Sequence, residues 1–155
     1  MPEAVALLIL TPLAGVTLVA LFVVMGVIFP RQIADVTSIG SATPGRSSIL
    51  GLINVAFLSV IVAAISGGGD LFQVLGLLLF AVLVIGLIFG LAGMAPMIGQ
   101  RLLPDSSETR QAIWGAAVMV VASLTPIIGW FLLFPYLAFR GLGAFILSLF
   151  RRTPS

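Results

Sequence analysis

Histidine, cysteine and lysine are all missing from this sequence of 155 residues. Without cysteine there is no disulfide, no thiolate metal site and no thiol nucleophile, and the redox compartment cannot be inferred. Without histidine, the commonest proton shuttle and the commonest metal or pigment ligand are missing as well. The sequence also holds no Ser/His/Asp set, no HExxH and no phosphate-binding GxxxxGK pattern. We therefore expect no enzyme activity, no metal site and no cofactor, and any contact with a lipid or pigment would not use histidine.

Charged residues are scarce. They make up 8% of the chain, seven arginines against five acids, while 61% of the residues are hydrophobic. A soluble domain could not cover its surface with so few charges. The net charge of +2 is too small and too dispersed for binding nucleic acid. The composition predicts an all-α integral membrane protein whose partners are membrane lipids and other integral membrane subunits.

Long apolar runs take up most of the chain, and a membrane-spanning helix needs about 20 apolar residues. The runs predict one transmembrane helical domain over residues 1–155, with five helices at about 4–29, 49–65, 71–98, 112–128 and 130–150. The last two helices come from one stretch that is too long for one crossing and barely long enough for two. Pro126, Gly129 and Trp130 favour a tight turn within it. The alternative is four crossings with a long, bent last helix.

The first loop covers residues 30–48 and begins where Pro30 stops the first helix. Three apolar residues recur in it at a helical spacing: Ile33, Val36 and Ile39. This spacing predicts a short helix on the membrane surface, with an ordinary solvated loop as the alternative. Ser47 and Ser48 are expected to cap the helix that follows.

Further signals concern the later helix ends. Asp70 follows three glycines, and we expect it to cap the third helix rather than bind calcium, which needs about six or more oxygens. Gly93 and Pro96 predict a tilt or a break in that helix. The spacing of Asp105 and Glu108 resembles the start signal of the helix expected near residue 112.

The arginines predict the orientation of the chain. With the N-terminus outside and five crossings, all arginines in loops and in the tail lie on one side: Arg31, Arg46, Arg101, Arg110, Arg151 and Arg152. Positive residues favour the cytoplasmic side, so the C-terminus is expected there. We expect a multi-pass protein of the prokaryotic cytoplasmic (inner) membrane.

Small residues form faces on which membrane helices can approach closely. Gly86, Gly90 and Gly93 lie on one face of the third helix, and Ser59 and Ala63 belong to a similar face of the second. These residues predict helix packing. The contact is either within the protein's own bundle or with a second copy or another partner.

Two polar residues fall inside apolar runs. A charge such as Arg140 near the middle of a bilayer costs several kcal/mol unless it is paired or reaches the interface. Arg140 either holds a lipid phosphate, an anionic ligand or a partner's carboxylate, or lies at the interface because its helix ends at Gly141 and Gly143. Asn54 is expected to bond across helices or to help solvate Arg140.

Several short motifs resemble a known family: Phe-Pro-Arg at residues 29–31, Gly51, Ile-Gly-Gln-Arg at 98–101, Pro-Ile-Ile-Gly-Trp at 126–130 and Gly-Leu-Gly-Ala at 141–144. From Phe29 onward the chain resembles the multi-pass membrane domain that follows the bactofilin-like, polymer-forming region of some bacterial proteins. The resemblance implies a prokaryotic inner-membrane anchor without catalytic residues. The sequence departs from that family in having no β-rich polymerising region and in carrying Arg140 where an apolar residue is expected.

Two classes of function remain. The first is a non-catalytic bundle that acts by lateral helix contacts, either as an accessory or scaffold subunit of a larger photosynthetic or respiratory complex or as a membrane anchor. The alternative is a small transporter or channel with a polar path near Asn54 and Arg140.

Overall fold

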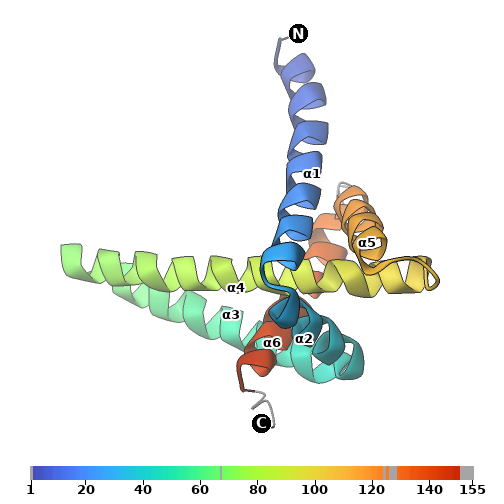
Figure 1. The fold of residues 1–155 in the computed structure, drawn as a ribbon. Coiled ribbons are helices and arrows are strands. Elements are labelled where there is room, and N and C mark those ends of the chain that lie inside the picture. The colour runs from blue at the N-terminus through green and yellow to red at the C-terminus, as the bar shows by residue number, and fades with distance from the viewer. Residues whose placement is uncertain (1, 67, 124, 126–128, 151–155) are drawn as a thin grey trace.

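Helices make up nearly all of the described chain. The computed structural model describes residues 2–66, 68–123, 125 and 129–150 (Figure 1). Over these residues it contains six α-helices and a short π-helix, in the order α1 (Pro2–Ile28), α2 (Pro30–Ala42), α3 (Pro44–Ser66), α4 (Asp70–Leu102), α5 (Glu108–Ser123), η1 (Gly129–Leu133) and α6 (Phe134–Phe150). The prediction of an all-α fold is confirmed.

Four segments of the described chain are long and apolar enough to cross a membrane: Ile9–Ile28, Pro44–Ile65, Asp70–Leu102 and Phe131–Phe150. The chain is a membrane protein. Helix α5 has 16 residues, about 24 Å of helix, which is shorter than the ~30 Å hydrocarbon core. The described residues thus hold four long apolar helices and two shorter ones, α2 and α5.

The last apolar stretch is divided between α5, which ends at Ser123, and the helical segment that begins at Gly129. The described residues of this stretch therefore form two helical segments. Part of the predicted turn, residues 124 and 126–128 and the side chain of Trp130, lies outside the described residues.

The first predicted loop is helical instead. Pro30 begins α2 and Pro44 begins α3, so α3 starts well before the predicted residue 49. Proline suits the first position of a helix, because its fixed φ is helical and its missing N–H would have no partner there. Ile33 and Val36 are buried inside the protein. The solvated-loop alternative is wrong, and the predicted short helix exists but turns these apolar residues toward the bundle.

Ser47 and Ser48 do not cap α3. The Ser47 hydroxyl donates to the carbonyl of Thr43 over 2.8 Å, and the Ser48 hydroxyl donates to the carbonyl of Pro44 over 2.8 Å. A serine inside a helix often bonds in this way to the carbonyl one turn earlier. The capping prediction is wrong because the helix already begins upstream of both serines.

Helix α4 is continuous from Asp70 to Leu102, with Pro96 inside it, so the predicted break does not occur. The hydroxyl of Thr37 in α2 lies 2.8 Å from the carbonyl of Gly93, one turn before the proline. Neighbouring helices commonly support a proline-containing membrane helix by such side-chain bonds. The N-cap residue of α4 is Gly69, and no side-chain capping bond is present there. The prediction that Asp70 caps this helix is therefore wrong. Asp70 is instead the first residue of α4, where its negative charge interacts favourably with the positive end of the helix dipole.

The helices meet in one packed region and extend from it in different directions (Figure 1). Helices α2, α5 and α6 pack against α4, and α1 contacts α4 and α5. We call the region where these helices meet the junction. Helices α3 and α4 extend side by side away from the junction, while α1 runs at a steep angle to α4. We call the outlying part of this helix pair, residues 52–65 and 71–85, the α3–α4 arm.

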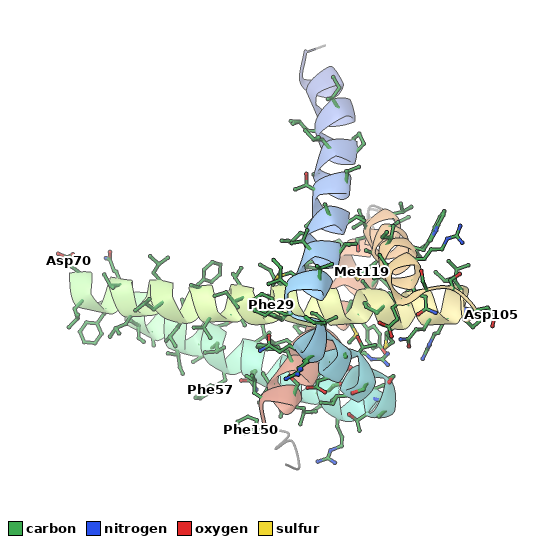
Figure 2. The ribbon with its side chains drawn as sticks, in the orientation of Figure 1. Phe29, Phe57, Asp70, Asp105, Met119 and Phe150 are labelled. Atoms are coloured by element: carbon green, nitrogen blue, oxygen red, sulfur yellow. The ribbon has the colours of Figure 1, made fainter. Side chains whose placement is uncertain are left out.

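Buried apolar side chains lie in the junction, where Val36 of α2 and Met94 of α4 are fully enclosed. The ring of Phe89 meets Phe29 edge-on, with centroids 5.1 Å apart, and stacks on Phe145 with centroids 5.2 Å apart. Large apolar side chains of the arm are exposed: Phe57, Val60, Leu71, Phe72, Leu75, Leu78 and Phe80. Figure 2 shows side chains projecting from the arm on several sides. The hydrophobic core therefore belongs to the junction, and the arm depends on its surroundings for cover.

Candidate functional site

Arg140 is the only charged side chain that is buried among the described residues, with 6% of its surface exposed. Its Nε donates to the carbonyl oxygen of Gly40 over 3.1 Å, and one terminal nitrogen donates to the same oxygen over 2.7 Å. The other terminal nitrogen donates to the hydroxyl of Tyr136 over 2.6 Å, one turn earlier on α6. The guanidinium also lies 5.7 Å from the centre of the Tyr136 ring. These contacts hold the middle of α6 against the end of α2.

The position of Gly40 explains how a cation can be buried without a carboxylate at these three bonds. Gly40 lies in the last turn of α2, which ends at Ala42. The last four carbonyls of a helix have no partner within the helix. They form the negative end of the helix dipole, which stabilises a nearby cation. The end of α2 thus supplies both the acceptor and the partial negative charge that the guanidinium of Arg140 requires.

Both sequence interpretations of Arg140 can be compared with this geometry. Helix α6 continues through Gly141 and Gly143 to Phe150, and the side chain is buried. The interpretation in which the helix ends and Arg140 reaches the interface is therefore wrong. In the other interpretation an anionic ligand would have to use the N–H donors that these three bonds leave, on a side chain that is 6% exposed.

Glycines let α6 approach its neighbours closely around Arg140. A Cβ atom at Gly90 of α4 would overlap the backbone of Gly141 and lie 2.6 Å from the backbone nitrogen of Leu142. A Cβ atom at Gly143 would overlap the carbonyl of Ser47 in α3. Backbone atoms cannot move aside as a flexible side chain can. The alternation of glycine and larger residues on α6 therefore fixes where α3 and α4 cross it.

The predicted packing residues fall into two groups. Gly86 faces Leu142 of α6, Gly90 faces Gly141, and Gly93 faces Val36 of α2. This glycine face is thus occupied by contacts within the same chain. Ser59 and Ala63, in contrast, are exposed on the arm.

Asn54 lies in α3 and is partly buried. Its side-chain nitrogen donates to the carbonyl of Leu50 in the same helix, over 3.2 Å. The bonds of Arg140 go to Gly40 and Tyr136, so Asn54 does not solvate Arg140 as expected. The two residues do not form a joint polar site.

Three residues that make polar contacts in the junction were missed by the sequence interpretation. Gly40 contributes only a backbone carbonyl, which sequence cannot mark. Tyr136 precedes Arg140 by four residues, a spacing that places both on one helix face and could have indicated the pair. Gln111 is 7% exposed and donates to the carbonyl of Leu103 over 2.9 Å, which ties α5 to the preceding turn.

Two cavities adjoin the junction. One has a volume of about 310 Å³ and is lined by α1, α4, α5 and α6, mostly with apolar side chains such as Leu18, Phe22 and Leu137. The other has a volume of about 440 Å³ and is lined by α1, α2, α4 and α5. Its lining includes several polar residues, among them Thr37, Ser41, Glu108 and Gln111. The first cavity is lined by two hydroxyl residues, Thr11 and Ser123, whereas the described lining of the second also includes amide side chains and a carboxylate.

The described residues contain no group of three or more acids, cysteines or histidines that could hold a metal ion. No family model, curated protein or solved structure matches this chain. The resemblance to the membrane domain of bactofilin-like proteins therefore stays a prediction from the motifs, and the function has to be inferred from the geometry described above.

Proposed function

We propose that this chain is a non-catalytic membrane protein that acts by lateral helix contacts, as an accessory or scaffold subunit of a larger membrane complex. The observation that supports the proposal most is the exposure of the α3–α4 arm. Its two helices contact each other, yet large side chains such as Phe57, Leu71 and Phe80 stay exposed. In a bilayer, helices associate through close packing of small residues rather than through the hydrophobic effect. Ser59 and Ala63 provide an exposed small face on the same arm.

The state of Arg140 supports a structural role over a conduit. A buried charge in a transporter usually faces a water-filled path or its substrate. Here the guanidinium is bound to the end of α2 and to Tyr136 within the junction. Asn54, the other proposed path residue, bonds within its own helix. We infer that Arg140 holds α2 and α6 together.

We further propose that the junction end of the helices faces the cytoplasm of a prokaryotic cell, in its inner membrane, and that α3 and α4 cross the membrane. Figure 2 places Asp70 and Asp105 at opposite ends of α4. The junction end of the helices carries exposed arginines: Arg31, Arg46, Arg101 and Arg110. Positive residues favour the cytoplasmic side. An N-terminus outside, a cytoplasmic C-terminus and the anchor role that the family resemblance implies are part of the same proposal, which rests on this distribution of arginines.

Site-specific photo-crosslinking in native membranes tests the proposal. A photoreactive amino acid at Ser59 or Ala63 is expected to give one discrete crosslinked product with another membrane protein. The same amino acid at Ala42, which is exposed at the end of α2, serves as the control. Crosslinks to lipid alone from both arm positions would contradict a partner on this face.

A further inference from the structure

The cavity of about 440 Å³ between α1, α2, α4 and α5 has a wall that offers hydrogen-bond acceptors. The hydroxyl of Ser41 donates to the carbonyl of Ser38 over 2.8 Å. The hydroxyl of Thr37 lies 2.8 Å from the carbonyls of both Ile33 and Gly93. A hydroxyl has one proton and two lone pairs. Because these hydroxyl protons are donated to backbone carbonyls, each hydroxyl oxygen can offer a ligand only its lone pairs, as a hydrogen-bond acceptor.

Gln111 adds an acceptor on the opposite wall, from α5. Its side-chain nitrogen donates to the carbonyl of Leu103 over 2.9 Å and to that of Pro104 over 3.3 Å. These two bonds use both amide protons and fix the amide group. The side chain is 7% exposed and lines the cavity. Its Oε1 has two lone pairs, which can accept hydrogen bonds from a ligand.

Glu108 supplies the charge. It lies one turn before Gln111 on α5 and is the only ionisable side chain in the described lining of the cavity. As a first-turn residue its carboxylate is stabilised by the helix dipole. The cavity therefore combines one negative charge with the acceptor oxygens of Thr37, Ser41 and Gln111, and its lining also includes the amide of Gln100 and the hydroxyl of Thr109.

We propose that this cavity binds a primary ammonium group carried by an amphipathic molecule. An ammonium group has three donors and no acceptor, which complements a carboxylate, an amide oxygen and hydroxyl oxygens. Calcium would need about six to eight oxygens at short range and more than one carboxylate in most sites. The side of the cavity formed by Val23, Val27 and Ile33 is apolar. That side would cover the hydrocarbon next to the ammonium group, whether the amine is a lipid headgroup or a free compound.

Native mass spectrometry of the full chain in detergent tests this proposal. The protein is mixed with phosphatidylethanolamine or with phosphatidylcholine, whose trimethylated nitrogen has no N–H donor. We expect phosphatidylethanolamine to be retained preferentially. Glu108→Gln, which keeps the size of the side chain, should weaken retention about tenfold through the loss of one charge-assisted bond.

The matched control is Asp105→Asn, which removes the same charge from the preceding turn without changing the described lining of the cavity. This variant should retain the lipid as the wild type does. Ser41→Ala, on the exposed side of α2, provides a second test that leaves α5 intact and should weaken binding several-fold.

Free ethanolamine distinguishes the two sources of the ammonium group. Displacement of the lipid by ethanolamine supports a site that also accepts soluble amines, and lipid preference without displacement assigns the site to the lipid headgroup. Equal retention of both lipids without any binding of ethanolamine would overturn the proposal. An equal loss in Asp105→Asn and Glu108→Gln would also overturn it, because the effect would then come from overall charge.

Discussion

Replacing Gly90 by alanine should destabilise the protein, although alanine is the better helix former. In the structure a Cβ atom at Gly90 overlaps the backbone of Gly141 and lies 2.6 Å from the nitrogen of Leu142. Overpacking of this kind costs about 1–3 kcal/mol, and relief would require α4 and α6 to move apart. The higher helix propensity of alanine stabilises the folded protein by about 1 kcal/mol at most. With the full gain subtracted, the net expectation is a loss of up to about 2 kcal/mol.

The matched control is the same substitution at Gly26 in α1, where an added Cβ atom meets nothing within 4 Å. Gly26→Ala should leave the stability unchanged or raise it by up to about 1 kcal/mol. Both variants can be compared by reversible unfolding in mixed micelles, followed by circular dichroism. A Gly90→Ala protein as stable as Gly26→Ala would refute the close crossing of α4 and α6, and with it the account of why Arg140 can reach α2.

Three further predictions concern the bonds that join helices in the junction. Arg140→Lys keeps the charge but loses the planar guanidinium, whose donors bind both Gly40 and Tyr136. It should lower the free energy of unfolding by about 1.5–3 kcal/mol in the same assay. Tyr136→Phe removes a single, partly exposed hydrogen bond to Arg140 and should lower the free energy of unfolding by about 0.5–1.5 kcal/mol. A larger loss of stability than for Arg140→Lys would contradict the prediction that Arg140 contributes more than Tyr136. Thr37→Val removes the hydroxyl beside the carbonyl of Gly93 and should lower the free energy of unfolding by about 0.5–1.5 kcal/mol. Amide hydrogen exchange should also become faster in the turn before Pro96. Unchanged exchange would show that this contact does not support α4.

The sequence was sufficient for the fold class, because long apolar runs of low charge can satisfy their backbone in lipid only as helices or closed barrels. The division of the last apolar stretch also followed from local chemistry, since Pro126 and Gly129 both disfavour a continuous helix. These conclusions depend on properties of neighbouring residues. They need no knowledge of which helices meet.

Errors arose where one residue type supports two local structures. Pro30 ends one helix and begins the next, and only the first role was assigned, so α2 was expected as a loop or a surface helix. Gly93 and Pro96 were expected to tilt or break α4; α2 packs beside them, and the helix continues without a break. Ser47 can cap a helix or bond backward inside one, and the choice depends on where the helix begins.

The environment of Arg140 could not be derived from sequence for a different reason. Its main partner is the backbone carbonyl of Gly40, a hundred residues earlier in the chain. A carbonyl is present at every position, so only the tertiary packing of α6 against α2 selects this one. Side-chain chemistry alone therefore suggested a ligand or the membrane interface, and missed the end of a helix.

The proposed function is tested most directly by extracting native membranes in mild detergent and identifying what co-migrates with this chain on a native gel by mass spectrometry. We expect stable co-migration with a larger membrane complex. Replacing Ser59 and Ala63, both exposed on the arm, by tryptophan should abolish it. Migration as a single chain or a small homo-oligomer, together with a solute flux that Arg140→Leu abolishes, would contradict the account and establish a transporter.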